Sequence, residues 1–470
     1  MEHHRTPIYQ TLKLFDDEKP ISFHVPGHKN GLLFPDYARE YFDSILKLDM
    51  TELPGLDDLH APTGAIAKAE KLAVDYFKSD HTFFLVGGST AGNLAMILAA
   101  CSAGDKVIVQ RNCHKSIMNG LELSGAKPVF IAPEYDSEVD RYTNPSMRTL
   151  PEAIQKHPDA KAIVLTYPDY FGKVYEIKEM TDLAHEYNIP VLVDEAHGVH
   201  FSLGNPFPAS ALELGADVVV QSAHKMAPAM TMASFLHIKS KLVSKEKVAH
   251  YLQMIQSSSP SYPLMASLDI ARSFLATLKS EVIDSVLQSA SKVRGILEDS
   301  DHWNIVPTDD PLKISLQLKK GTSAKEAASL FEGQRIYPEL VTHNQILFIH
   351  GLAPFQKMNQ LKKAVKRVNE QLKNNSNHDT IDVAKLFPQT IEELALSYQA
   401  MNQLQTLQLS RAEAVGYIAA EAVIPYPPGI PLILKGEKIT AKHIDVMEQL
   451  NIQGVRIQQR EMDGIRVYRK

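Results

Sequence analysis

Short apolar runs alternate with stretches of helical spacing over residues 65–237. Apolar runs bounded by turn residues are typical of buried strands, and apolar positions three or four residues apart indicate helices. This alternation favours an α/β fold with a mostly parallel sheet that is covered by helices on both faces. The predicted strands are residues 82–86, 106–110, 128–131, 162–166, 191–194, 217–221 and 231–237, and the predicted helices are residues 65–77, 91–100, 116–123, 150–156 and 176–187.

The pattern changes toward both ends of the chain. The first 50 residues show little periodicity and predict an ordered arm, whereas helices dominate residues 240–297. Further on, predicted strands at 313–318 and 345–350, predicted helices at 324–331, 354–372 and 410–419, a polar linker at 373–379 and a proline-rich turn at 425–429 indicate further domains. We therefore predict an N-terminal arm (1–50), a large domain (51–297), a small α+β domain (298–372) and a C-terminal domain (380–470).

Composition narrows the class of protein. Of 470 residues, 44% are hydrophobic and 22% are charged, as is usual for a globular protein. The net charge of −6 argues against a nucleic-acid partner or an anionic membrane surface. Two cysteines argue against a disulfide framework, and the N-terminus has no apolar signal segment. No apolar run reaches transmembrane length, so we expect a cytoplasmic protein.

Two neighbouring predicted strands end in residues that can carry chemistry. Asp194 ends one apolar run, and Lys225 follows the next within the motif Ser-Ala-His-Lys at 222–225. A desolvated lysine is nucleophilic, and a carboxylate can keep a pyridine nitrogen protonated, so the pair fits a pyridoxal phosphate (PLP) site. Each residue alone has a plainer interpretation. Asp194 can form a salt bridge or cap a helix, and Lys225 can be a surface lysine.

The Gly-Gly-Ser-Thr turn at 87–90 lies between a predicted strand and a predicted helix. Backbone N–H groups and hydroxyls at a helix N-terminus can hold a phosphate, although Ser and Thr also cap helices without any ligand. No Walker lysine follows, which argues against a nucleoside triphosphate. His114, after another strand, can stack on an aromatic cofactor or have a structural role. His197 can orient Asp194 or be a simple loop histidine.

Two other kinds of site find little support in the sequence. Asp194, Glu195, His197 and His200 offer metal ligands at short spacing but lack the HExxH order, so no metal site is predicted. The nucleophile elbow G-x-S-x-G is absent, which argues against a serine hydrolase.

Eight segments, which together span nearly the whole chain, carry a family resemblance. They are HVPGHK at 24–29, GLDDLHAPTG at 55–64, GSTAGN at 88–93, RNCHKS at 111–116, DEAHG at 194–198, SAHK at 222–225, SSSPSY at 257–262 and PYPPGIP at 425–431. With these segments the chain resembles the Orn/Lys/Arg decarboxylases, PLP-dependent enzymes of fold type I. The resemblance implies an aspartate-aminotransferase-like α/β fold with an α+β C-terminal region.

The same resemblance implies a role for each candidate residue. Lys225 is then the lysine that forms a Schiff base with PLP, and Asp194 is the partner of the ring nitrogen. His114 is expected over the ring face, and His197 near the ring oxygen and Asp194. The residues expected around the phosphate are Ser89, Thr90, Ser222 and His224. Lys225 or His224 is the candidate that returns a proton to the substrate's Cα after decarboxylation.

The substrate is inferred with less support from the residues. Glu421 is the candidate for the basic end of the substrate, with Asp57 and Asp58 behind it, because a carboxylate can accept two hydrogen bonds from a guanidinium. Alternatively, Glu421 braces the proline-rich turn. Short-form members of the family are most often arginine decarboxylases, so the resemblance implies arginine to agmatine plus CO₂, a step in polyamine biosynthesis. Lysine and ornithine, which would give cadaverine and putrescine, are the alternatives.

Other activities and the assembly are also matters of expectation. An aldolase, an aminotransferase with Arg335 as the substrate-carboxylate clamp, and a non-catalytic PLP-binding protein stay open. The family builds its active site at a dimer interface, so Ser259 and Tyr262 are candidates to serve the neighbouring subunit. The chain begins almost directly at the core, without the wing domain of the large members, which predicts a homodimer or a dimer of dimers.

Overall fold

The computed structural model describes residues 1–372, 386–387, 389–425, 430–452, 455, 457–459 and 464–469. By its internal contacts the chain divides into unit 1, Met1–Ala100 with Ile177–Lys279, and unit 2, Cys101–Glu176 with Ser280–Lys470. The predicted linker at 373–379 and residues 426–429 of the predicted turn lie outside the described residues. The four domains expected from the sequence remain a prediction.

Unit 1 contains four strands in the order β1-β9-β8-β7. These strands are β1 (His81–Leu85), β9 (Ser234–Ile238), β8 (Val218–Gln221) and β7 (Val191–Asp194). The strands β7 and β8 are parallel, whereas β9 runs antiparallel to both β8 and β1. Every residue of β7, β8 and β9 is buried, which explains their continuous apolar runs.

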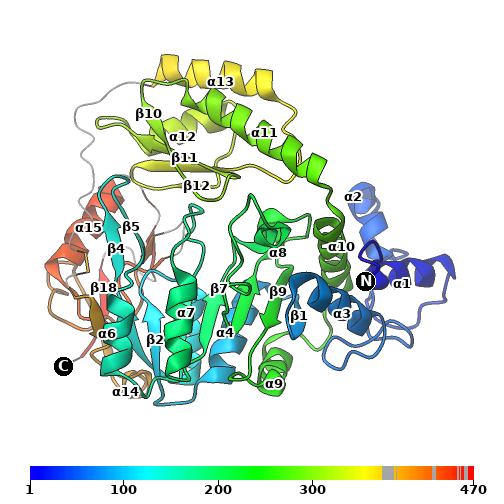
Figure 1. Ribbon diagram of the computed structural model, residues 1–470, viewed down its shortest axis with the longest axis horizontal. Coiled ribbons are helices and arrows are strands. Elements are labelled where there is room, and N and C mark those ends of the chain that lie inside the picture. Colours follow the sequence, from blue (N-terminus) through cyan, green and yellow to red (C-terminus); the bar gives the residue numbers. More distant parts are fainter. Residues whose placement is uncertain are drawn as a thin grey trace. The chain divides into compact units, whose positions relative to one another are not determined.

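Helices cover this sheet. The helix α4 packs against all four strands and against α9, and α3 packs against β1 (Figure 1). The helices of unit 1 are α1 (Pro7–Asp17), α2 (Asp36–Leu46), α3 (Ala65–Phe77), α4 (Gly88–Ala100), α7 (Ile177–Glu186), α8 (Ala223–Met226), α9 (Lys245–Ile255) and α10 (Tyr262–Thr277), with a 3₁₀-helix, η1, at Val199–Leu203.

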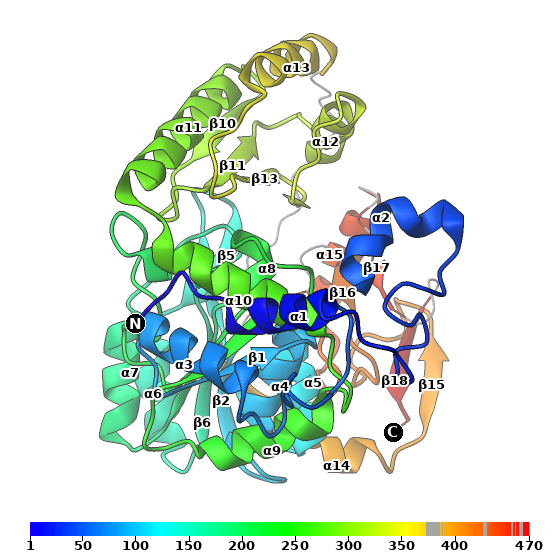
Figure 2. The same cartoon turned by 90° about the vertical axis from the view of Figure 1, so that its right-hand side faces the viewer.

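The N-terminal arm contains the helices α1 and α2, which the sequence pattern did not predict. The helix α1 lies against α3 and α10 (Figure 2) and buries Ile8 and Leu12. A fully buried pair on α10 anchors it: Asp269 accepts the N–H of Ile8, and Arg272 donates to backbone carbonyls in the segment just before α1. The arm is therefore part of the packed unit.

Unit 2 contains a second set of strands in the order β6-β2-β3-β14. These are β6 (Ala162–Thr166), β2 (Lys106–Gln110), β3 (Lys127–Ile131) and β14 (Ile391–Glu393), of which only β14 runs antiparallel to its neighbour. Parallel strands under helices in both units confirm the predicted α/β class. The helices are α5 (Lys115–Ser124), α6 (Thr149–Lys156), α11 (Ser280–Glu298), α12 (Ala324–Gly333), α13 (Met358–Gln371), α14 (Tyr398–Met401) and α15 (Ala441–Ile452).

A separate antiparallel sheet in unit 2 follows the order β10-β11-β13-β12. Its strands are Trp303–Val306, Lys313–Leu318, Gln345–Ile349 and Leu340–Val341, respectively. The helices α11, α12 and α13 lie on one face of it (Figure 1) and share its apolar core, which includes Trp303 and Phe331. The remaining strand pairs are β4 (Pro133–Asp136) with β5 (Arg141–Pro145), β15 (Thr406–Leu409) with β18 (Ile465–Tyr468), and β16 (Ile424–Pro425) with β17 (Ile457–Gln458).

The helix predicted at 410–419 is wrong. One turn forms, because the Ser410 hydroxyl accepts the N–H of Glu413 and donates a hydrogen bond to the Glu413 carboxylate. Gly416 then takes a left-handed backbone with φ of 86°, and its N–H donates to the carbonyl of Ile439 instead of continuing a helix. In the part of the chain that the structure describes, no helix is long and apolar enough to cross a membrane.

A directed chain of side-chain hydrogen bonds crosses the buried sheet of unit 1. His237 lies between Thr82 Oγ1, 2.8 Å from its Nδ1, and Gln221 Oε1, 3.1 Å from its Nε2. The amide oxygen of Gln221 can only accept, so Nε2 carries the proton and Nδ1 accepts from Thr82. Ser79 bonds to Thr82 at one end, and Gln221 donates to Glu195 at the other. Burial lowers the pKa of His237 to about 3, so the ring stays neutral.

Because of this neutral ring, His237 should make the fold sensitive to acid. Below pH 6.5 the unfolded chain protonates this histidine but the folded chain does not, so the free energy of unfolding falls as the pH falls. His237 alone should lower the free energy of unfolding by up to about 1.4 kcal/mol for each pH unit of acidification. His237→Gln, which keeps a donor and an acceptor, should lose that part of the slope in denaturant titrations between pH 6.5 and pH 4. His250→Gln, at an exposed position of α9, is the control, and equal slopes for wild type and both variants would contradict the assignment.

Candidate active site

Asp194 lies at the end of β7, with 3% of its surface exposed. Its Oδ2 accepts a hydrogen bond of 2.8 Å from the side-chain amide of Asn93, and its Oδ1 accepts one of 3.2 Å from the N–H of Ala196. Both donors are neutral. A buried carboxylate is costly without a charged partner, so this arrangement suits a cationic N–H supplied by a ligand.

Lys225 reaches the same region from the adjacent strand. It lies in the short helix α8, just after β8, and its Nζ is 2.9 Å from Nε2 of His197. His197 follows Asp194 by three residues, so the lysine amine, the imidazole and the carboxylate gather at the strand ends. This is the edge of a parallel sheet where ligands bind.

The Gly-Gly-Ser-Thr turn leads directly into α4. Gly88 has φ of 73°, a left-handed backbone that favours glycine. The amide oxygen of Gln256 accepts the N–H groups of Val86 and Gly87 at 2.7 and 3.3 Å, which fixes the start of the turn. The hydroxyl of Ser222, after β8, donates to the hydroxyl of Ser89 at 2.9 Å. Two predicted phosphate residues are thus in contact, and Thr90 follows in the first turn of α4, where N–H groups lack helical acceptors.

Glu195, next to Asp194, is fully buried and is held differently. It accepts hydrogen bonds from the Ser210 hydroxyl at 2.8 Å, from the Ala211 N–H at 2.7 Å and from the Gln221 amide. Burial raises its pKa to about 7, against the opposing effect of these three bonds. Glu195 thus fixes the loop after β7, and Asp194 faces the candidate site.

Two predicted histidines have clear local contacts. His224 Nδ1 is 3.1 Å from the carbonyl of Ala233, to which it donates. His114 belongs to unit 2, where it caps α5, with its Nδ1 2.9 Å from the hydroxyl of Ser116. Their expected roles at the phosphate and over the ring stay predictions.

Asp57 and Asp58 are engaged within unit 1. Asp57 accepts N–H groups of residues 58, 63, 64, 66 and 67 at 2.8–3.3 Å and so holds the loop before α3 and its first turn. Burial raises the pKa of Asp57, but these bonds outweigh it and leave the pKa lowered. Asp58 accepts the N–H of His60, and the Tyr262 hydroxyl donates to the Asp57 carbonyl at 2.6 Å. A substrate role for either carboxylate would have to compete with these contacts.

The remaining candidates lie elsewhere. Glu421, in unit 2, accepts the backbone N–H of Arg466 at 3.1 Å, which agrees with a bracing role and leaves the substrate role a prediction. Ser259 is exposed in the loop before α10, and Arg335 is exposed after α12 with φ of 62°. Among the described residues, no group of His, Cys, Asp and Glu is arranged to hold a metal ion.

The matching family models decide the family. The model of the major domain of Orn/Lys/Arg decarboxylases matches residues 6–317, and that of their C-terminal domain matches residues 379–460. The chain belongs to the Orn/Lys/Arg decarboxylase family. Members of this family are PLP-dependent decarboxylases of basic amino acids, and the predicted enzyme class is confirmed.

Individual relatives agree with this family. The uncharacterized protein YaaO of Bacillus subtilis is 43% identical over 95% of this chain and 94% of its own length. An arginine decarboxylase of the same organism is 36% identical over 94% of this chain and 93% of its own length. The solved lysine decarboxylase A of Pseudomonas aeruginosa superposes with a TM-score of 0.84 at 20% identity, covering 99% of this chain and 80% of that structure, which confirms the fold.

Three residues that hold this candidate site were not identified from the sequence, and all three have side-chain amides. Asn93 holds Asp194, Gln221 holds Glu195, and Gln256 holds the turn before α4. Only Asn93 had a usable signal, because it follows Ser89 by four residues and therefore shares its face of the helix. All three amides contact positions 26–170 residues away in the sequence.

The close approach of α4 to the sheet gives a second prediction. A Cβ on Gly92 would lie 2.8 Å from both Leu85 Cδ1 and Val220 Cγ1. Gly92→Ala should therefore destabilise the protein, because overpacking of about 1–3 kcal/mol exceeds the gain in helix propensity of about 1 kcal/mol. Gly295→Ala, in α11 with open space at its Cβ, is the matched control and should stabilise slightly. Chemical denaturation measures both, and a stabilised Gly92→Ala would refute the close packing.

Proposed function

We propose that this protein binds PLP and decarboxylates L-arginine to agmatine and CO₂. The observation that carries the proposal is the buried Asp194 with two neutral donors, beside Lys225 and the Ser89–Ser222 contact. A pyridinium N–H would give Asp194 the charged partner that its described contacts lack. Lys225 would hold the cofactor through its amine, and the first turn of α4 would hold the phosphate.

Arginine is favoured over lysine by the relatives. Four relatives named arginine decarboxylase are 34–36% identical over at least 93% of this chain. A biodegradative arginine decarboxylase of Escherichia coli is 24% identical, and two relatives named lysine decarboxylase are 22–23% identical. Glu421 is our candidate for the guanidinium, since a carboxylate can accept it through two parallel hydrogen bonds.

PLP, when bound, supplies an electron sink for the bond that breaks as CO₂ leaves. Asp194 would keep the ring nitrogen protonated. Lys225 would hold the cofactor through its amine, which lies 2.9 Å from His197 Nε2. The same amine would return a proton to the substrate's Cα after CO₂ leaves, with His197 or His224 as the neighbouring proton carrier.

The assembly and location belong to the same proposal. We infer a cytoplasmic homodimer, or a dimer of dimers, that acts in polyamine biosynthesis. Ser259 and Tyr262 are the candidates that complete the neighbouring subunit's site, with His114 over the ring in each site. Size-exclusion chromatography coupled to light scattering measures the mass in solution.

Replacing the proposed cofactor lysine should abolish catalysis. Lys225→Ala should lose the visible absorbance of lysine-bound PLP and at least about 10²-fold in turnover, because it removes both the covalent attachment and the proton donor. The control Lys241→Ala changes an exposed lysine after β9 and should match the wild type. Absorbance spectra and CO₂ release give the two readouts, and retained decarboxylation in Lys225→Ala would overturn the assignment.

The substrate is tested by offering arginine, lysine and ornithine separately to PLP-loaded protein and identifying the amines by mass spectrometry. The kcat/KM for arginine, measured as agmatine formation, should be at least about tenfold above that for lysine or ornithine. This ratio is equivalent to a difference in activation free energy of about 1.4 kcal/mol. Glu421→Gln should mainly raise the KM for arginine. Cadaverine or putrescine as the main product would show that lysine or ornithine, and not arginine, is the substrate. α-Keto acids would indicate an aminotransferase, and no amine from any substrate would refute decarboxylation.

A further inference from the structure

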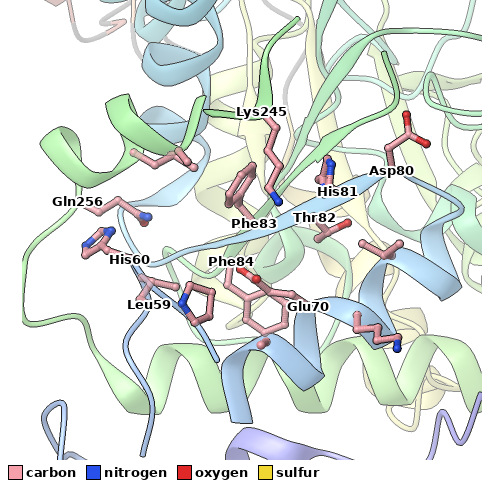
Figure 3. A pocket seen from close by; sticks show the side chains of 16 residues that line it. Leu59, His60, Glu70, Asp80, His81, Thr82, Phe83, Phe84, Lys245 and Gln256 are labelled. Carbon is pink, nitrogen blue, oxygen red and sulfur yellow. The ribbon is translucent and has the colours of Figure 1, made fainter. Parts of the chain in front are cut away.

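The pocket beside β1 contains groups that serve the strand itself. It has a volume of about 480 Å³ and lies between α3, α9 and the edge of β1 (Figure 3). Two lining residues hold backbone N–H groups there: Glu70 accepts that of Phe84, and Gln256 accepts that of Val86 at 2.7 Å. Burial raises the pKa of Glu70 to about 8. The other lining side chains are acidic, basic and apolar, so the pocket indicates no particular ligand.

The N-terminal arm, in contrast, presents a large apolar surface to the solvent. The side chains that are 64–93% exposed between residues 21 and 41 are Ile21, Phe23, Leu32, Leu33, Tyr37 and Tyr41. The three aromatic ones are 81–93% exposed and together leave about 400–650 Å² uncovered, since such a side chain can bury about 150–250 Å². With the aliphatic residues added, the exposed apolar area of the arm exceeds the about 300–600 Å² of the largest apolar patch on a typical monomer.

The sequence of the arm has the patterns of covered faces. Residues 21–25, Ile-Ser-Phe-His-Val, alternate between apolar and polar, and the three apolar side chains are the more exposed ones. Tyr37 and Tyr41 are four residues apart on α2 and therefore share one face of the helix. Alternation with period two and spacing by four are typical of a strand and a helix that each bury one face. In unit 1 both faces are left open.

Polar contacts within the arm fix its backbone. The ammonium of Lys29 donates to the carbonyl of His24, and the guanidinium of Arg39 donates to the carbonyls of residues 31 and 32 at 3.1 Å. The arm therefore satisfies its polar groups internally and leaves its apolar side chains outside, the reverse of the usual burial order. Such a segment is a preformed docking surface, because little conformational entropy is lost when a partner covers it.

The charges around α2 are balanced. Residues 29–47 contain three basic and three acidic residues, namely Lys29, Arg39, Lys47, Asp36, Glu40 and Asp43. Arg39 pairs with Asp36 at 3.0 Å and with Asp43 at 3.6 Å. Such a surface can face a copy of itself across a two-fold axis without like-charge repulsion. It has no excess of Lys and Arg that would attract an anionic membrane or a nucleic acid.

We propose that residues 21–41 form the surface on which a second copy of this chain docks. This inference rests on the homodimer of the proposed function and names the surface that forms it. A standard interface buries about 800 Å² per partner, and the exposed aromatic and aliphatic side chains of the arm reach that scale. The arm continues from α1, which packs against α10, and α10 begins at Tyr262, a candidate for the neighbouring subunit's site. Docking on the arm would bring the partner to this part of unit 1.

A matched pair of leucines tests the arm. Leu33, in the arm, and Leu123, in α5, are 64% and 63% exposed, so an aspartate at either position alters the single chain to a similar degree. Leu33→Asp and Tyr37→Asp should each raise the dissociation constant of the dimer at least about tenfold, because each buries a carboxylate in the interface. Leu123→Asp should leave it unchanged. Mass photometry of the PLP-loaded, full-length proteins over a dilution series measures this constant, and chemical denaturation checks that the variants are folded.

A photo-cross-linker locates the contact directly. Benzoylphenylalanine incorporated at Tyr41 should, on illumination of the purified protein, give a covalent species of twice the chain mass of 52.3 kDa. The same group incorporated at Leu123 should not. Denaturing electrophoresis separates the two masses, and mass spectrometry of the cross-linked peptides identifies the segment that was reached. This readout also decides the case of a dimer too tight to dissociate on dilution.

Three outcomes would overturn the assignment. A dimer that stays as tight in Leu33→Asp and Tyr37→Asp as in the wild type, with no cross-link between chains, would place the interface elsewhere. A wild type that is monomeric at every concentration would remove the second copy. Cross-links confined to one chain would show that another part of the same chain covers the arm. CO₂ release and PLP absorbance are recorded for the same samples, so a failure of the proposed decarboxylation would be seen separately from a failure of the arm.

Discussion

The structure of unit 1 depends on how two adjacent carboxylates are buried at the end of β7. Glu195 is satisfied from within, by the hydroxyl of Ser210, the N–H of Ala211 and the amide of Gln221. Asp194 has only Asn93 and the N–H of Ala196 among its described partners. Burying an ionised group without compensation is expensive, so the fold tolerates Asp194 only with a strong partner nearby. Members of the family use PLP, and its protonated ring nitrogen would be such a partner for Asp194.

Neutral amides link the site to the body of the sheet. Gln221 joins Glu195 to the chain of hydrogen bonds through His237 and Thr82, and Gln256 fixes the turn before α4. Buried polar networks of this kind fix one arrangement, because each unsatisfied member would be costly. The turn and the strand end are thus held by residues remote in sequence.

The sequence predicted the buried, regular parts of the fold well. The helix at 65–77 and the strands at 106–110, 162–166 and 191–194 have the predicted bounds, because continuous apolar runs and helical spacing follow directly from burial. Long-range contacts could not be predicted. The bond from Asn93 to Asp194 joins positions 101 residues apart. Likewise, the Gly416 bond to Ile439 ended a helix that local propensity favoured. The hydrogen bonds by which Asp57 organises the start of α3 were not foreseen either, and its substrate role stays a prediction.

The position of β1 has a consequence for the solubility of the protein. Within the described residues β1 ends the strand order of unit 1 and pairs only with β9, so its other side could recruit a strand from another molecule. Glu70 takes the outward N–H of Phe84, and Lys245 and Asp80 place charges beside the strand. Short strands with charged flanks are poor templates for aggregation. The Glu70 carboxyl, which is costly to bury, thus also hinders β1 from pairing with a strand of another molecule.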